Sequence, residues 1–256
     1  MQRAIFFMHI AKTAGSYVNS LFRDTLGEAR AVDHIEMRLP NAELLRSAVD
    51  EGGVDFVSGH VYLRLWSELA KTTSRPFFRF TVIRDPIEHL ASHILWLDHY
   101  NLPEKRGECA RLSEAHQRLV DLIGRVNFAD MGALDAFLTH LPAAGVQLLD
   151  NCQSRYFVCG PGASTAHHDP LTLSHADQIA RAARCFDLVI RQDCLAAGIA
   201  KVNTLTGLAL EASEARVNVA KSERAIDTKN PVVRSIFGKR TLVDQWLWRS
   251  AVAGKF

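Results

Sequence analysis

A lysine among small and hydroxyl-bearing residues follows the first apolar segment of the chain. Residues 5–10 are mostly apolar, and residues 11–16 read Ala-Lys-Thr-Ala-Gly-Ser. Residues 17–22 have helical spacing, so this loop should lead into a helix N-terminus, whose free N–H groups and partial positive charge favour an anion. Lys12 adds a full positive charge. The segment therefore predicts a phosphate-binding loop.

The loop differs from the G-x-x-x-x-G-K-[ST] loop of nucleoside triphosphatases. The required glycines do not precede Lys12, and Gly15 follows it instead. A standard ATPase or GTPase is therefore not expected.

A second candidate phosphate site lies at residues 80–92. Residues 77–83 are aromatic and β-branched and predict a strand, and Asp85-Pro86 predicts a helix start, because proline is tolerated in the first turn. Arg84 then lies at the carboxyl end of the strand. Ser92 lies about two turns into the helix on the side that faces back to this end. The guanidinium of Arg84 and the hydroxyl of Ser92 can therefore hold one phosphate together.

These two segments resemble the donor-binding motifs of sulfotransferases that use 3′-phosphoadenosine 5′-phosphosulfate (PAPS), especially the branch of heparan and uronyl sulfotransferases and their bacterial relatives. The 5′-phosphosulfate loop of that branch reads roughly H-I-P-K-T-A-G-T, and its 3′-phosphate element reads R-D-P-x-x-R-x-x-S. The matching segments here are residues 9–16 and 84–92. The resemblance implies transfer of a sulfuryl group from PAPS to a hydroxyl of a carbohydrate or glycosylated small molecule, with 3′,5′-ADP as product and no metal.

The resemblance also assigns roles to individual residues. Residues 54–61 and 151–157 resemble further family segments, and residues 216–222 resemble a V-N-x-S-x-K loop that folds over the nucleotide. Lys12 would stabilise the leaving phosphate oxygen in addition to binding the donor. The donor-binding residues implied in this way are Lys12, Thr13, Ala14, Gly15, Ser16, Tyr17, Arg84, Ser92 and Lys221.

His60 is the candidate general base. The Gly59-His60 pair ends a predicted strand, and histidine titrates near neutral pH. The 2-O- and 6-O-sulfotransferases of the family use a histidine at a similar position. Two alternatives remain open: His60 is a structural residue at a strand end, or the base is His34 or Glu36, near the end of a second predicted strand.

Three residues depart from the family pattern. Ala11 replaces a proline and removes a constraint on φ before Lys12. His89 replaces an arginine, which we interpret as the loss of a salt bridge. Ser16 replaces a threonine, a minor chemical change.

Strand-like and helical segments alternate along the chain and predict an α/β fold. We expect a P-loop-like three-layer fold in a single domain, residues 1–256, with helices on both faces of a central parallel sheet. Lys12, His60 and Arg84 would then meet at the carboxyl edge of this sheet. The expected strands are 3–10, about 31–35, 54–59, 77–83 and 186–191, and the expected helices are 16–26, 41–51, 62–71, 86–99, 113–125, 131–140, 193–206 and 240–253.

Composition excludes several other classes of protein. A net charge of +2 is too small for non-specific nucleic-acid binding. No apolar run reaches the roughly 18 residues of a membrane span, and no signal peptide precedes the first strand, so we expect a cytoplasmic protein. The five cysteines are odd in number and form no C-x-x-C pair, which favours reduced thiols over a structural zinc.

The remaining polar groups leave alternatives open. Arg155 would hold an acidic sugar or the nucleotide, or form a salt bridge at the edge of the core. We expect residues 167–169, His-His-Asp, to be a solvated loop and not a metal site. Residues 100–113 and 158–172 are candidate acceptor-side loops. The rival functions are an atypical nucleotide-dependent phosphotransferase and an inactive nucleotide-binding module.

Overall fold

Five parallel strands form one central sheet in the computed structural model of this protein, which describes residues 3–212 and 224–255. The strand order is β2-β3-β1-β4-β5. Register pairs Phe6 of β1 with Val57 of β3 on one side and with Arg79 of β4 on the other. The strands are β1 (Ala4–Met8), β2 (Ala31–Val32), β3 (Phe56–Gly59), β4 (Phe77–Ile83) and β5 (Leu188–Arg191).

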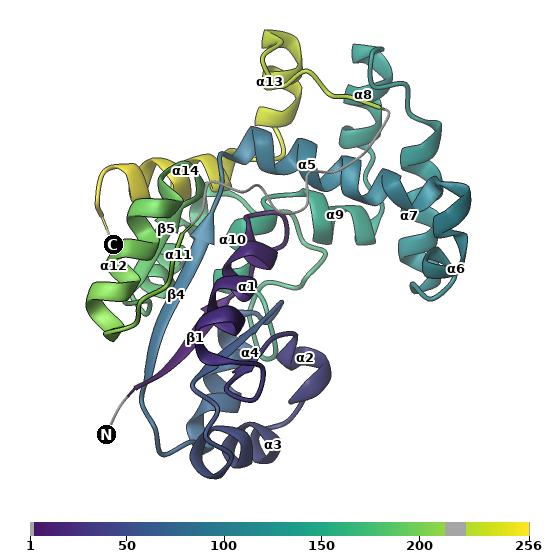
Figure 1. The fold of residues 1–256 in the computed structure, drawn as a ribbon. Coiled ribbons are helices and arrows are strands. Elements are labelled where there is room, and N and C mark those ends of the chain that lie inside the picture. The colour runs from purple at the N-terminus through teal and green to yellow at the C-terminus, as the bar shows by residue number, and fades with distance from the viewer. Residues whose placement is uncertain (1–2, 213–223, 256) are drawn as a thin grey trace.

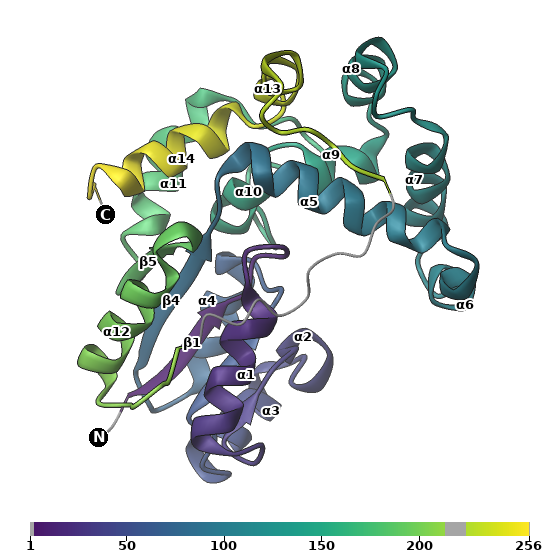
Figure 2. The same ribbon diagram turned by 45° about the horizontal axis from the view of Figure 1, so that its top comes forward.

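Helices cover both faces of this sheet, because the side chains of the central strand alternate between two apolar cores. Ile5 and Phe7 face α1 (Gly15–Leu26) and α12 (Leu195–Thr206). Phe6 and Met8 face the opposite layer, and Figures 1 and 2 show the two layers. The helices of this opposite layer are α3 (Ala42–Arg46), α4 (Leu63–Leu69), α10 (Cys152–Val158), α11 (Ala176–Ala183) and α14 (Leu242–Val252). The predicted three-layer α/β fold is confirmed.

A third group of helices lies beyond the carboxyl edge of the sheet. It contains α5 (Pro86–Asp98), which continues directly from β4 and passes above the end of β1 (Figure 2). Ile94 of α5, Leu119 of α7 and Phe237 of α13 are buried in one apolar cluster. The other helices of the group are α7 (Glu114–Arg125), α8 (Met131–Thr139), α9 (Ala143–Leu149) and α13 (Pro231–Gly238).

Several predicted boundaries were wrong. The first strand ends at Met8, not at residue 10, so His9 belongs to the loop. The second strand ends at Val32, and the short helix α2 (Ile35–Arg38) follows it. The predicted helix 41–51 divides into α3 and a π-helical turn, Ser47–Glu51. Residues 100–113 contain helical turns, including α6 (Arg106–Cys109), whereas residues 159–172 form neither helix nor strand.

Lys221 and the 216–222 segment lie outside the described residues. Within residues 3–212 and 224–255, no helix has both the length and the apolar composition needed to cross a membrane.

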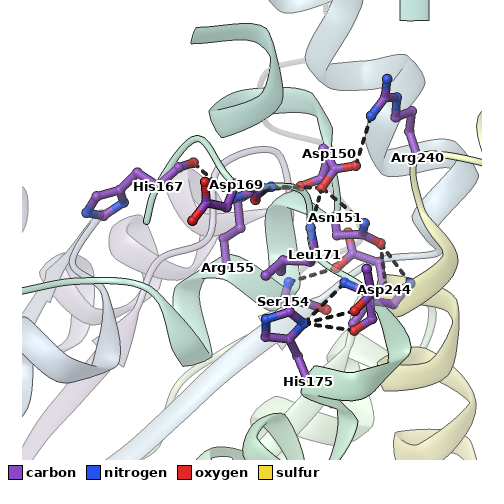
Figure 3. A network of polar contacts seen from close by, with 12 residues as sticks. Asp150, Asn151, Ser154, Arg155, His167, Asp169, Leu171, His175, Arg240 and Asp244 are labelled. Atoms are coloured by element: carbon purple, nitrogen blue, oxygen red, sulfur yellow. Dashed lines mark hydrogen bonds and ion pairs between the residues drawn. The ribbon is translucent and has the colours of Figure 1, made fainter. Parts of the chain in front are cut away.

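Arg155 is a buried structural residue and not a ligand-facing one. Its side chain is 1% exposed and pairs with the Asp150 carboxylate at 2.7 Å. The guanidinium also donates to the carbonyl oxygens of His167 at 2.9 Å and Asp169 at 2.8 Å, and these bonds fasten the 159–172 segment to α10 (Figure 3). Of the two alternatives for Arg155, the structure supports the salt bridge, although its position is inside the core.

This burial predicts a large effect of Arg155→Ala on stability. The substitution removes a positive charge that pairs with the buried Asp150 carboxylate. The free energy of unfolding should therefore fall by about 3–5 kcal/mol. Chemical denaturation measures the change. Arg118→Ala is the control, because the Arg118 side chain is 68% exposed in its pair with Glu114 and its loss should cost less than about 1 kcal/mol. Equal effects of the two substitutions would contradict the assignment.

Candidate active site

Three adjacent strands place their following residues at one edge of the sheet. β3, β1 and β4 are neighbours and parallel, so their carboxyl ends meet at this edge. His60 follows β3, the loop with Lys12 follows β1, and Arg84 follows β4. The structure thus brings together the three principal residues predicted from the sequence.

The loop between β1 and α1 takes an unusual backbone path. Lys12 and Ala14 have φ values of 67° and 77°, a left-handed conformation that costs energy for residues with a β-carbon. The Thr13 hydroxyl is buried and donates to the Ile10 carbonyl at 2.8 Å. Thr13 can therefore contact a ligand only through its backbone, whereas the Ser16 side chain is exposed.

The N-terminus of α1 offers backbone donors beside this loop. Val18 has the first amide of α1 with a recorded helical hydrogen bond, which it donates to the Ala14 carbonyl at 3.1 Å. Among the described residues, no backbone hydrogen bond is recorded from the amides of Thr13, Ala14, Gly15 or Ser16. Such amides are the groups with which a helix N-terminus binds an anion.

Two cations lie close to these amides. The Lys12 ammonium is half-buried 5.9 Å from the centre of the Trp96 ring, and none of the described carboxylates lies within ion-pair distance of it. An Arg84 Nη1–H donates to the Lys12 carbonyl at 3.4 Å. Burial and the nearby Arg84 charge lower the pKa of Lys12. An anion bound here would relieve the repulsion between the two cations.

The backbone of Arg84 is fixed by a side chain from α10. The Gln153 carboxamide accepts from the Arg84 N–H at 2.8 Å and donates to the Arg84 carbonyl at 3.0 Å. Asp85 caps α5 by accepting from the amides of Ile87 and Glu88. Together these contacts hold Arg84 at the junction between strand and helix.

Glu88 and Ser92 lie four residues apart on α5 and share one face of the helix, and Arg84 lies just before its N-terminus. Ser92 is half-buried on this face. The Glu88 carboxylate lies 3.7 Å from Arg84 Nη2, within ion-pair distance but too far for a hydrogen bond. Arg84 therefore reduces the repulsion that Glu88 would exert on a phosphate beside Ser92.

His60 belongs to a group of histidines around one carboxylate. Its Nδ1 lies 2.8 Å from the His9 carbonyl, and its backbone N–H donates to Glu36 at 3.1 Å. The other Glu36 oxygen lies 3.2 Å from His34 Nδ1. Since a carbonyl only accepts, the proton of neutral His60 is on Nδ1, and Nε2 has a free lone pair. Nε2 can therefore accept a proton from a substrate.

The surroundings keep His60 neutral near physiological pH. Burial lowers its pKa, and the His34 ring lowers it further, whereas Glu36 and the His9 carbonyl raise it, with a net shift downward. Burial, with the neighbouring His60 and His34, lowers the pKa of His9 to about 2. Both rings are thus uncharged in the folded protein. His34 and Glu36 contact each other and Glu36 holds the His60 backbone, an arrangement that positions His60.

His89 has a role that the sequence did not indicate. It is buried, and its Nε2–H donates to the Ala11 carbonyl at 2.8 Å. Interpreting the arginine-to-histidine change only as a lost salt bridge therefore missed a bond that joins α5 to residues 9–14, the candidate anion-binding loop. Gln153 and His9 were also not predicted as supporting residues of the site, although Gln153 lies in the segment 151–157 that resembles a family segment.

The other candidates lie outside this cluster. Residues 167–169 belong to a partly exposed loop and, among the described residues, are in neither of the groups that bring three metal-ligand atoms together.

Comparison with known proteins adds no relative: no family model matches the chain, and no curated protein matches it. The function is therefore inferred from the motifs in the sequence and from the geometry of the site.

The close contact between Gly15 and His9 predicts a specific defect. A β-carbon on Gly15 would lie 1.9 Å from the His9 ring, so Gly15→Ala must displace His9 and should destabilise the fold by about 1–3 kcal/mol. Gly107→Ala is the control, because nothing lies within 4 Å of its added carbon. Denaturation of Gly15→Ala/His9→Ala completes a double-mutant cycle. Strict additivity of the two changes would contradict the proposed contact.

Proposed function

We propose that this protein is a sulfotransferase that moves a sulfuryl group from PAPS to a hydroxyl on a carbohydrate or glycosylated small molecule. One observation supports this proposal above the others. Half-buried Lys12 lies against Arg84 at the open N-terminus of α1, with no described carboxylate within ion-pair distance of its ammonium. Such a site favours an anionic ligand, and the motifs at residues 9–16 and 84–92 favour PAPS among such ligands.

The donor would bind with its phosphosulfate at the loop and its 3′-phosphate at Arg84. The amides at residues 13–17 would hold the 5′-phosphate oxygens. Arg84 and Ser92 would hold the 3′-phosphate, the group that distinguishes PAPS from ATP. The product 3′,5′-ADP would keep the same contacts.

The chemical step needs charge stabilisation and one proton acceptor. The acceptor hydroxyl attacks sulfur, the bond from sulfur to the bridging phosphate oxygen breaks, and its electron pair stays on the phosphate of 3′,5′-ADP. Lys12 would stabilise this developing negative charge, and His60 Nε2 would take the hydroxyl proton. The step needs no metal.

The acceptor would enter beside the 159–172 segment. Arg64, four residues after His60, donates to the carbonyl oxygens of Pro161 at 3.2 Å and Gly162 at 2.8 Å. The rings of Tyr62 and His167 lie 4.7 Å apart. These contacts hold the segment against residues that closely follow His60, which supports its assignment to the acceptor side. Residues 100–113 are the second candidate acceptor-side loop.

The cellular location is part of the proposal. All five cysteines are free thiols, and burial raises the pKa of both Cys152 and Cys159. Free thiols fit a reducing compartment, and we propose the cytoplasm.

Transfer of labelled sulfate tests the function directly. The protein is incubated with labelled PAPS and an extract of glycans, lipids and metabolites from its own host, and the labelled product is identified. We expect transfer to a hydroxyl-bearing saccharide or glycosylated molecule. Lys12→Ala should fold normally and lose most turnover, because its charge matters most in the transition state. Donor binding without any transfer would support the inactive module, and transfer from ATP would support the phosphotransferase.

Binding of 3′,5′-ADP tests the 3′-phosphate site. The nucleotide should raise the melting temperature without added metal, because it binds only the folded state. Arg84→Ala should weaken its binding by about 2–4 kcal/mol, the scale of lost charged hydrogen bonds. Calorimetric titration with 5′-AMP is the control. An equal loss of 5′-AMP affinity would make Arg84 structural.

The pH dependence of turnover tests His60. A base with a lowered pKa stays neutral as pH falls below the ordinary histidine value of 6.5, so turnover should decline only below that pH. His60→Ala should lose on the order of a hundredfold in turnover with 3′,5′-ADP affinity nearly unchanged. A lower melting temperature with proportionate losses of binding and turnover would instead make His60 structural, and His34 or Glu36 would be the next candidate base.

A further inference from the structure

Three buried residues with metal-ligating side chains meet beneath the anion-binding loop. His89 and His93 lie four residues apart on α5 and therefore share one face of the helix. Cys152 begins α10. One possible ligand atom from each of the three lies within 4.8 Å of the others, and all three side chains are buried.

One of these side chains lacks the partner that burial requires. Nδ1 of His93 is buried and has no hydrogen-bond partner among the described residues. A buried polar atom without a partner is costly and needs an explanation, such as an ion. His93 is 2% exposed, so bulk solvent does not reach this atom.

His89 already has the second contact that is typical of a metal-bound histidine. Its Nε2 donates to the Ala11 carbonyl, which leaves Nδ1 unprotonated in the neutral ring. Metal-ligating histidines usually donate their other ring N–H to a carbonyl or carboxylate in this way.

We propose that His89, His93 and Cys152 bind one zinc ion beneath the anion-binding loop. Two imidazoles and one thiolate form a donor set suited to zinc. The sequence expectation against a structural zinc rested on the absence of C-x-x-C pairs. This set uses a His-x-x-x-His pair and a cysteine distant in the sequence, so spacing between cysteines does not reveal it.

Binding would exchange a proton for the metal. Zinc would replace the thiol proton and form a Zn–S bond, with release of that one proton. The thiolate is needed because Lys12 and Arg84 add positive charge close to His89. Zinc affinity should therefore rise with pH.

The site would act on structure and not on the chemical step. It would join α5 to α10 directly, and through His89 it would hold the Ala11 carbonyl, next to Lys12. Since zinc binds only the folded arrangement, it should raise the melting temperature of the protein.

Cobalt substitution in the full chain tests this site without any need for turnover. Chelator-treated protein is titrated with Co²⁺, which takes zinc sites and shows a thiolate-to-cobalt absorption band. We expect one equivalent to bind with this band and zinc to displace it. Cys152→Ser should abolish the band. Cys159→Ser is the matched control, since Cys159 is also a buried free thiol near the end of α10, and it should keep the band.

Further variants separate this site from the less buried group of His34, Glu36 and His60, whose ligand atoms also lie within 4.8 Å of one another. His93→Gln should weaken Co²⁺ binding at least about tenfold, and it replaces the Cys152 comparison if Cys152→Ser does not fold. His34→Ala should leave the band unchanged. Absence of the band in the unsubstituted protein, or its loss only in His34→Ala, would overturn the proposal. Neither outcome depends on whether PAPS is the donor.

Discussion

The close approach of Lys12 and Arg84 is the constraint on which the rest of the site depends. Two cations beside a helix N-terminus repel one another, and the loop that carries Lys12 has two left-handed residues that add strain. The surrounding structure compensates for both costs. Gln153 holds the backbone of Arg84 through two hydrogen bonds, and His89 holds the loop carbonyl. A bound anion would replace this repulsion with attraction, and PAPS is the anion that we propose.

The base side of the site depends on the same strand order. Because β3 and β4 lie on opposite sides of β1, the residues that follow them reach the loop from two directions. Arg84 approaches from β4 with a charge, whereas His60 approaches from β3 in a neutral state. The His9 carbonyl fixes the tautomer of His60, and Glu36 fixes its backbone. The geometry thus separates a charged side, where we propose that the donor binds, from an uncharged side that contains the proposed base.

The sequence predicted the parts of the site that follow from strand ends and could not predict the contacts that support them. Lys12, His60 and Arg84 were placed correctly, because parallel strands bring their carboxyl ends to one edge. Gln153 bonds to Arg84 and His89 bonds to Ala11, and both pairs are far apart in the sequence. A local sequence pattern cannot predict contacts of this kind. Arg155 remained ambiguous because burial decides whether an arginine binds a ligand or a core carboxylate. Helices α9, α10, α11 and α13 were missed. Helices α9 and α10 have only seven residues each, too few for a clear helical period, whereas α11 is strongly amphipathic and was overlooked.

A crystal structure of the protein with 3′,5′-ADP tests the central claim most directly, because it shows both phosphates at once. The account predicts the 5′-phosphate within hydrogen-bond distance of Lys12 and the amides of residues 13–16. It predicts the 3′-phosphate on Arg84 and Ser92, with space between the 5′-phosphate and His60 Nε2 for the sulfuryl group and the acceptor hydroxyl. A nucleotide bound away from this edge, or bound with its 3′-phosphate in solvent, would contradict the account.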